Sequence, residues 1–287
     1  MRQRTVGQRT VGVIGLGAMP LSVDERPPRA QAIRTVHAAL DAGVTLVDTA
    51  DAYCRDASDV GHNEQLVAEA LAAWNGDRAS VVVATKGGHV RGGDGSWSVN
   101  GRPDYLRQAC EASLRTLGVD RIDLYQYHRP DPHVPLAESL GALADLQAEG
   151  KIDQVGVSNL NVDQLNEART VVDLASVQNE FSPAFRSSAD EVEYCATHQI
   201  AFLAWSPLGG MGAASGLGKK FPQFAEVAAE HGVSPQQVTL AWELRRGDTM
   251  IPIPGATRPE TILDSIAAAD LELTDEQCRR LDGEAPR

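Results

Sequence analysis

Short apolar runs rich in valine and isoleucine alternate along the chain with longer stretches in which apolar residues recur at helical spacing. A short run bounded by turn residues indicates a buried β-strand, and helical spacing of apolar residues indicates an amphipathic helix. Strands are expected near residues 11–17, 44–48, 81–85, 122–127, 153–157, 174–178, 200–205 and 249–253. Helices are expected near residues 30–42, 63–73, 103–117, 135–149, 161–170, 188–198 and 234–246.

Several predicted helix ends carry capping residues. Pro103 suits a first helical turn, and Gly118 suits the stop of the same helix. Ser234 stands before another proline at a predicted helix start. Thr274 with Gln277 has the spacing of a capping box, which predicts one more helix near the end of the chain.

Strand–helix alternation at this spacing predicts the α/β class, with a parallel sheet and right-handed crossovers. Counting residues 11–17 as the first strand gives eight strands, the number that closes a TIM barrel, and 287 residues suit one such barrel. An open doubly wound sheet is the alternative. No linker, repeat or low-complexity segment divides the chain, so residues 1–287 are expected to form a single (β/α)8 domain with a short N-terminal extension. Its active site is expected at the C-terminal face.

The formal net charge is -13, and an acidic surface disfavours nucleic acid and anionic membranes as partners. No apolar stretch reaches the roughly 18 residues that a membrane helix needs. Glycines and a proline interrupt the apolar run near the N-terminus, which disfavours a signal peptide. The four cysteines are scattered without metal-ligand spacing, so no metal site is predicted and reduced thiols are expected. We therefore expect a cytoplasmic protein with no obligate protein partner.

The glycines between residues 11 and 19 imitate a dinucleotide-binding turn. Such a turn needs a third glycine and a helix that receives the pyrophosphate. Pro20 occupies the third glycine position, and residues 21–28 contain two prolines and no helical period. A barrel strand whose glycines let a cofactor approach the backbone is the better interpretation.

Four residues capable of acid–base chemistry lie at or just beyond predicted strand ends: Asp48, Tyr53, Lys86 and His128. Parallel strands of a barrel bring such ends together on one face, where its chemistry takes place. Taken singly, each residue has an ordinary structural explanation. Asp48 suits a helix cap, Tyr53 a packed aromatic ring, Lys86 a surface lysine and His128 a hydrogen-bonded histidine. Together they can give a proton to a carbonyl oxygen while another group delivers a hydride. Asp48 is expected to pair with Lys86, and the ammonium is expected to lower the pKa of Tyr53 from about 10.

The chain resembles the aldo-keto reductases from Thr10 to about Leu281, nearly its whole length. The matching segments stand at predicted strand ends and follow the order of the family. They are Asp48-Thr49-Ala50-Asp51-Ala52-Tyr53 with Asn63-Glu64, Ala84-Thr85-Lys86, residues 123–128, Gly156-Val157-Ser158-Asn159, Val177-Gln178-Asn179, residues 205–209 and residues 253–260.

The resemblance implies a nicotinamide cofactor, NADP (NADPH), with NAD possible. It assigns Ser158, Asn159 and Gln178 to the carboxamide and Trp205 to stacking on the nicotinamide ring, roles that suit their donors, acceptors and flat apolar surface. The full set of expected cofactor residues is Gly17, Met19, Asp48, Ser158, Asn159, Gln178, Trp205, Ser206, Pro207, Leu208, Gly209, Gly255, Thr257, Arg258, Thr261 and Ser265.

Two departures from the family pattern bear on these assignments. Cys54 stands where the family usually has a glycine after the tyrosine. Its thiol either fills space or has a redox role, and the space-filling interpretation is the simpler of the two. In the last loop, the positions that grip the adenosine 2′-phosphate in much of the family become Gly255, Ala256 and Thr261. Arg258 is the remaining cation there, so the choice between NADPH and NADH stays open.

The resemblance implies reduction of an aldehyde or ketone to an alcohol, with Tyr53 as the proton donor and His128 orienting the carbonyl oxygen. Two alternatives are a barrel aldolase that uses Lys86 as a Schiff-base nucleophile and a non-catalytic subunit that senses the nicotinamide nucleotide. The small-molecule carbonyl substrate is open. His89, Arg91 and Trp97 in the loop after Lys86 favour a fairly open and partly polar site, which suits a sugar-like compound, a pyridoxal-type aldehyde or a general xenobiotic carbonyl.

Overall fold

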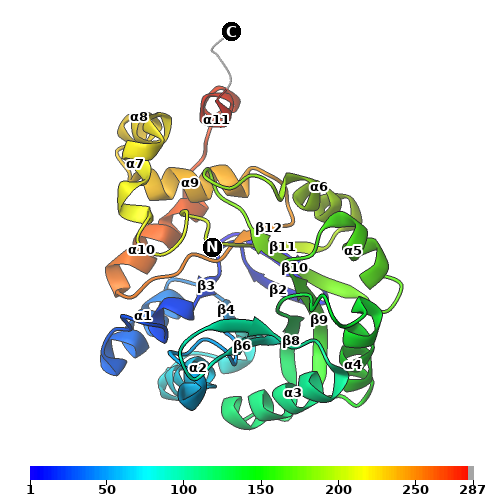
Figure 1. The fold of residues 1–287 in the computed structure, drawn as a ribbon. Coiled ribbons are helices and arrows are strands. Elements are labelled where there is room, and N and C mark those ends of the chain that lie inside the picture. Colours follow the sequence, from blue (N-terminus) through cyan, green and yellow to red (C-terminus); the bar gives the residue numbers. More distant parts are fainter. Residues whose placement is uncertain (284–287) are drawn as a thin grey trace.

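The computed structural model describes residues 1–283. Within them, eight parallel strands form one sheet in the order β3, β4, β5, β8, β9, β10, β11, β12. The two edges of the sheet meet, because Gly17 bridges Gly255 and the amide of Gly15 donates a hydrogen bond to Pro252 O at 3.0 Å. Figure 1 looks onto the resulting barrel with its surrounding helices. The predicted (β/α)8 architecture is confirmed, and the open doubly wound alternative is wrong.

Every strand predicted after the first coincides with a strand of the barrel. The barrel strands are β3 (Leu16–Gly17), β4 (Leu46–Asp48), β5 (Val82–Gly87), β8 (Ile122–Tyr127), β9 (Ile152–Ser158), β10 (Leu174–Glu180), β11 (Ala201–Trp205) and β12 (Met250–Pro252).

The first predicted strand, 11–17, is wrong in its extent. The barrel strand β3 contains only Leu16–Gly17, while β2 (Arg9–Gly12) pairs antiparallel with β1 (Gln3–Val6). This hairpin is the N-terminal extension. Its Val6 and Val11 are fully buried in one apolar cluster with inward residues of the barrel strands, so the hairpin covers one end of the barrel core. The same apolar alternation suits a barrel strand and a capping hairpin, and local periodicity does not separate them.

The helices pack outside the strands, and each of the seven helices predicted between strands is confirmed. They are α1 (Arg29–Asp41), α2 (His62–Ala73), α3 (Pro103–Leu117), α4 (Leu136–Ala148), α5 (Val162–Ala168), α6 (Ala189–His198) and α9 (Pro235–Leu244). The capping predictions at Ser234 and at Thr274 with Gln277 are confirmed by side-chain hydrogen bonds, and Gly118 ends α3 with φ 67°.

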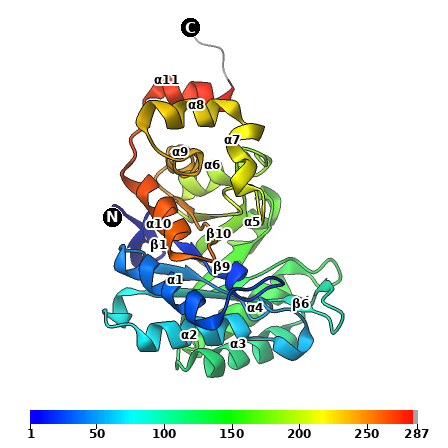
Figure 2. The same ribbon diagram turned by 90° about the vertical axis from the view of Figure 1, so that its left-hand side faces the viewer.

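Additional helices were not predicted: α7 (Leu217–Lys220), α8 (Pro222–His231) and α10 (Pro259–Ala267). The capping box at Thr274 begins α11 (Asp275–Asp282), which packs against α8 at the end of the molecule opposite α2 and α3 in Figure 2.

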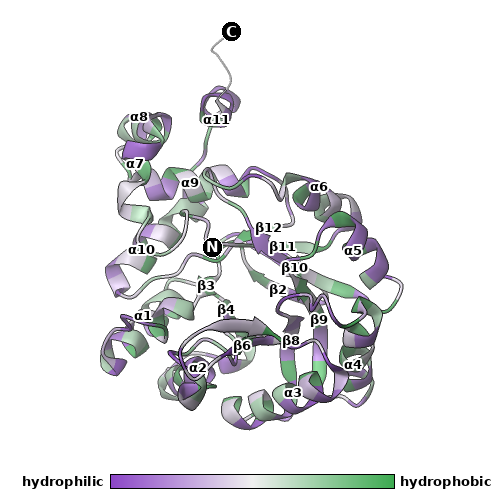
Figure 3. Ribbon diagram, in the orientation of Figure 1, coloured by the Kyte–Doolittle hydropathy of each residue, from purple (hydrophilic) through white to green (hydrophobic). Residues whose placement is uncertain are grey.

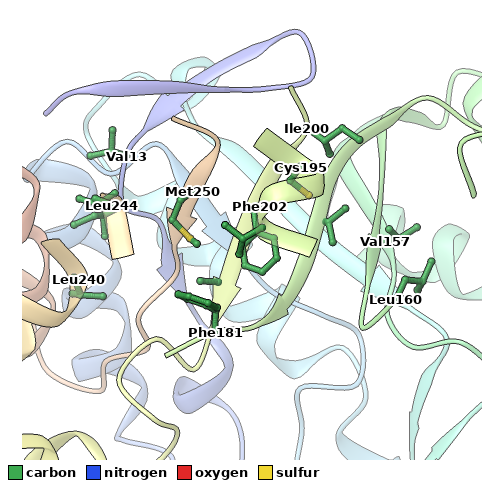
Figure 4. Packing of buried hydrophobic residues seen from close by; sticks show 14 of the residues in the cluster. Val13, Val157, Leu160, Phe181, Cys195, Ile200, Phe202, Leu240, Leu244 and Met250 are labelled. Carbon is green, nitrogen blue, oxygen red and sulfur yellow. The ribbon is translucent and has the colours of Figure 1, made fainter. Parts of the chain in front are cut away.

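Apolar side chains fill the layer between the outside of the barrel and the helices. Each helix of the ring therefore carries both apolar and polar residues, as the colouring of Figure 3 shows. Phe202 on β11 and Met250 on β12 are register partners in this layer, with Leu240 of α9 in the same cluster (Figure 4). Trp242 of α9 is fully buried and stacks on Phe181, with ring centres 5.7 Å apart.

Two long segments follow C-terminal ends of barrel strands. The first, residues 87–102, follows Lys86 and contains an antiparallel hairpin of β6 (His89–Arg91) and β7 (Trp97–Val99), with Arg91 opposite Trp97. The second, residues 207–220, is largely turns with glycines at positive φ, and ends in α7. The barrel thus presents one structured hairpin and one irregular loop beside its reactive face.

Candidate active site

The four predicted acid–base residues meet at the C-terminal ends of β4, β5 and β8. Asp48 is the last residue of β4, Lys86 lies in β5, and His128 follows β8. Lys86 Nζ lies 2.7 Å from Asp48 Oδ2 and 2.9 Å from the Tyr53 hydroxyl oxygen. The rings of Tyr53 and His128 meet edge to face, with centres 5.6 Å apart. Parallel pairing puts the strand ends at one level, so residues far apart in the sequence form one cluster.

Lys86 is fully buried, and its ammonium group has three hydrogen-bond acceptors. Besides Asp48 and Tyr53, it donates to the backbone oxygen of Thr49 at 2.9 Å. Burial acts to lower the pKa of Lys86, but attraction to Asp48 and Tyr53 outweighs it and raises the pKa above its usual value. Lys86 therefore stays an ammonium. A Schiff base needs a neutral amine, which this arrangement disfavours.

The pKa of Tyr53 shifts in the direction opposite to the one expected from the sequence. Burial of the phenol raises its pKa above 10, and although Lys86 acts in the opposite direction it does not overcome burial. The hydroxyl group consequently keeps its proton at neutral pH. A group that gives a proton must first hold one, and the neighbouring ammonium then stabilises the phenolate that remains.

His128 is buried as a neutral imidazole. Burial lowers its pKa well below 6.5, and the positive charge of Lys86 acts in the same direction. Its backbone is held from two sides: its amide donates to Gly87 O at 2.9 Å, and its oxygen accepts from Asn159 Nδ2 at 3.0 Å. Within residues 1–283, His128 Nδ1 has no hydrogen-bond partner although it is buried. A neutral imidazole can donate one N–H to a substrate oxygen.

Asp48 is held by two amide side chains in addition to Lys86. Gln178 Nε2 donates to Asp48 Oδ1 at 2.7 Å, and Gln126 Nε2 approaches the same oxygen at 3.3 Å. Sequence reasoning missed Gln126. The sequence does contain a signal for it, because Gln126 is a polar residue within a largely apolar strand and stands two residues before His128. Side chains two residues apart in a strand point to the same face of the sheet.

Cys54, the residue after Tyr53 in the chain, is fully buried. Its thiol donates to Ala52 O at 3.4 Å, while Arg91 Nε donates to the backbone oxygen of Cys54 at 3.0 Å. Burial raises the pKa of the thiol to about 11. The thiolate is the reactive form of cysteine, so the geometry favours the space-filling interpretation.

The residues expected to hold the carboxamide form one connected group beside His128. Ser158 Oγ donates to Gln178 O at 2.6 Å, and the Asn159 amide donates to Asn179 Oδ1 at 2.7 Å. Asn159 has φ 61°, a left-handed conformation that is strained for a residue with a side chain. The surrounding hydrogen bonds hold it there, which fixes the direction of its side chain at the mouth of the barrel.

Trp205 and Ser206 continue this surface at the end of β11. Ser206 is a second non-glycine residue of the site with left-handed backbone, at φ 51°, and Gly209 follows with φ 88°. Trp205 Nε1 is buried without an acceptor among the described residues. Pro207 and Leu208 are buried beneath the turn. A half-buried aromatic face can lie against a flat ring, and the assignment of Trp205 to the nicotinamide remains a prediction.

The predicted residues near the barrel seam differ in accessibility. Gly17 lies at the seam, and a side chain there would stand 2.7 Å from Ile253 O. Met19 and Thr257 are half-buried, whereas Gly255 and Arg258 are exposed. Thr261 is half-buried, and Ser265 is buried with its hydroxyl donating to Thr261 O at 3.2 Å. Arg258 is thus the cation that this loop presents outward, at the start of α10.

Fold and site together define a (β/α)8 enzyme with acid–base groups at the carboxyl ends of its strands. The chain belongs to the aldo/keto reductase family, whose family model matches residues 13–285. It is 35% identical over 283 residues to the uncharacterized oxidoreductase C215.11c of Schizosaccharomyces pombe, with 97% of this chain and 88% of that protein covered.

Solved structures agree with this assignment. The aldo/keto reductase from Klebsiella pneumoniae in complex with NADP and acetate is 30% identical, with a TM-score of 0.81 and coverage of 100% of this chain and 98% of that chain. The glycerol dehydrogenase from Gluconobacter oxydans is 28% identical, with a TM-score of 0.83 and coverage of 98% and 94%. Within residues 1–283, no helix combines the length and apolar character needed to cross a membrane.

Proposed function

We propose that this protein reduces an aldehyde or a ketone to an alcohol with NADPH, and that Tyr53 gives the proton. The observation that carries the proposal is the contact of Lys86 Nζ with both Asp48 and the Tyr53 hydroxyl, at 2.7 and 2.9 Å, inside a fully buried cluster. The cofactor follows from family membership and from the NADP complex of the Klebsiella relative.

Ser158, Asn159 and Gln178 would hold the carboxamide, and Trp205 would lie under the ring. NADPH supplies the hydride for the carbonyl carbon when it is bound. The remaining steps belong to this chain. Neutral His128 donates a hydrogen bond that orients the carbonyl oxygen, and Tyr53 transfers its proton to that oxygen. Lys86, held by Asp48, stabilises the resulting phenolate.

Replacing Tyr53 with Phe tests the proton donor. Turnover should fall by about a hundredfold to ten-thousandfold, the range of general acid catalysis, while NADPH still binds. Tyr194→Phe is the matched control, because its hydroxyl lies on α6 and contacts Asn166 at 2.9 Å. Loss of NADPH absorbance with a panel of aldehydes and fluorescence titration of NADPH measure the two quantities. Unchanged turnover in Y53F would remove Tyr53 from the mechanism.

Arg258 is proposed as the residue that favours NADPH over NADH. It is exposed at the N-terminus of α10, where a phosphate also gains from the free amides of the first turn. Arg258→Gln should raise the KM for NADPH on the order of tenfold and leave the KM for NADH nearly unchanged. Equal effects on both cofactors would show that Arg258 does not recognise the 2′-phosphate.

The aldolase alternative requires a neutral Lys86. The pairing with Asp48 and the raised pKa of Lys86 disfavour it. Borohydride trapping in the presence of a carbonyl substrate distinguishes the two reactions: no substrate adduct on Lys86 is expected. A nucleotide-sensing subunit would instead bind NADPH and turn over no member of the aldehyde panel.

A further inference from the structure

Arg129 stands beside the reacting groups and has no part in the mechanism above. It follows His128 at the end of β8 and is half-buried. It lines a cavity of about 390 Å³ together with Asn159, Glu180 and Trp205. Its guanidinium carbon lies 6.0 Å from the centre of the Trp205 ring. A permanent cation therefore opens onto the same space as the residues expected around the nicotinamide.

No ion pair within residues 1–283 includes Arg129, whereas arginines such as Arg9, Arg26 and Arg107 have a carboxylate within 4.0 Å. The charge is nevertheless felt at the reactive centre. Its field contributes to lowering the pKa of His128 and of His89, and it acts in the same direction on Tyr53. A guanidinium group stays charged in proteins, so this charge is available to a ligand.

The cavity also contains carboxyl groups, and their state matters for its selectivity. Burial raises the pKa of Glu180, an effect that Arg129 opposes without contacting the carboxyl group. Burial likewise raises the pKa of Glu191, on α6 at the edge of the cavity. Both carboxyl groups are thus less inclined to ionise than exposed ones, and neither neutralises Arg129 by contact.

We propose that Arg129 binds an oxyanion on the substrate, so that the preferred aldehyde or ketone carries a carboxylate or a phosphate in addition to its carbonyl group. This assignment rests on the reductase function proposed above and names its substrate class. The planar fork of a guanidinium group matches the two oxygens of such an anion. Because Arg129 adjoins His128, binding the anion there and the carbonyl at His128 would orient the substrate across the site.

Matched pairs of substrates test the proposal. One pair is para-carboxybenzaldehyde and its methyl ester, and the other is glyceraldehyde phosphate and glyceraldehyde; the two pairs separate carboxylate from phosphate recognition. The wild-type protein should favour the anion in at least one pair. Arg129→Gln should raise the KM for that anionic substrate by about tenfold to a hundredfold, the value of a charge-assisted hydrogen bond. The kcat of the variant and its kinetics with the neutral partner should change little.

Three further variants make the result specific. Arg34→Gln removes the same charge from an exposed position on α1 and should leave the preference unchanged. Arg129→Lys should restore part of the preference, because it restores the charge without the fork. Glu180→Gln should act in the opposite direction and lower the KM for the anionic substrate, since it removes an opposing carboxyl group.

The outcomes separate the two levels of the proposal. If the wild-type protein and R129Q reduce the neutral aldehydes equally and neither favours an anion, the reductase function stands and the role of Arg129 is overturned. An equal loss on charged and neutral substrates also overturns it, because Arg129 would then support the site structurally. If no aldehyde of either pair is reduced with NADPH, the reductase function fails and the substrate assignment fails with it.

Discussion

Two buried carboxyl groups near Lys86, those of Asp48 and Asp51, have different surroundings. Asp48 is 2% exposed and Asp51 6% exposed, so burial does not distinguish them. Asp48 receives hydrogen bonds from Lys86 and Gln178, both at 2.7 Å. Asp51 has one oxygen without a partner among the described residues. The two carboxyl groups therefore differ in the hydrogen-bond donors that contact them and not in their burial.

The region around Asp51 is polar but holds no ion pair among the described residues. Burial and the neighbouring Glu64 raise the pKa of Asp51 well above its usual value, and burial also raises the pKa of Glu64. The Tyr125 hydroxyl is buried there without a partner among the described residues. Asp48 is therefore held by donors on the reactive side of Lys86, whereas burial raises the pKa values of Asp51 and Glu64 on the side toward α2 and α3. A buried carboxylate persists where a cation touches it.

The largest expected difference between the two carboxyl groups is in the stability lost when each aspartate is replaced with asparagine. Asp48→Asn leaves the buried ammonium of Lys86 without a counter-charge and should lower the free energy of unfolding by about 3–5 kcal/mol. Asp51→Asn should lower it much less, because Asp51 has no ion-pair partner among the described residues and its raised pKa disfavours its charged form. Urea denaturation of the two variants and the wild-type protein measures both. Equal losses would show that Asp51 is ionised and paired like Asp48.

The pH dependence of stability gives a second test of this difference. The contribution of Asp51 to the free energy of unfolding should change by up to about 1.4 kcal/mol per pH unit. The folded-state pKa of Asp51 is raised, so the unfolded chain loses this proton first as pH increases. The stability contributed by Asp51 is complete below the unfolded value of about 3.9 and declines as pH rises toward the folded value. Compared with D51N, the wild-type protein should therefore lose stability as the pH rises above about 4. A constant difference above that pH would contradict the raised pKa of Asp51.

Replacement or alkylation of Cys54 should give the smallest effect. Its thiol is a third buried acidic group, and no cation of the described residues contacts its sulfur atom. Arg91 contacts only the backbone oxygen of Cys54, and burial raises the pKa of the thiol to about 11. Iodoacetamide at neutral pH should leave Cys54 unmodified, as mass spectrometry of the Cys54 peptide would show. Cys54→Ala should cost about 1 kcal/mol of stability through lost packing with turnover nearly unchanged. Rapid alkylation of Cys54 with parallel loss of activity would instead assign it a redox role.

Sequence reasoning predicted the barrel and brought Asp48, Tyr53, Lys86 and His128 to one place. It succeeded because strand ends are local features and parallel strands align them. It failed for the first strand, since residues 11–17 carry an apolar pattern that a barrel strand and a capping hairpin share. It missed Gln126, which contacts Asp48, and the position of Arg129 in the cavity beside Trp205, because both depend on contacts between strands distant in the sequence.

The sequence by itself determined the order of strands and helices, the acid–base residues at three strand ends, and the resemblance that membership of the aldo/keto reductase family confirmed. These features are written in short segments and their spacing. Only the tertiary structure decided that the pKa of Tyr53 is raised, that Asp48 contacts a cation whereas Asp51 has no ion-pair partner among the described residues, and that Arg129 lines the cavity without a carboxylate partner among them. Each of these depends on desolvation and on contacts between residues distant in the chain, which no local pattern records.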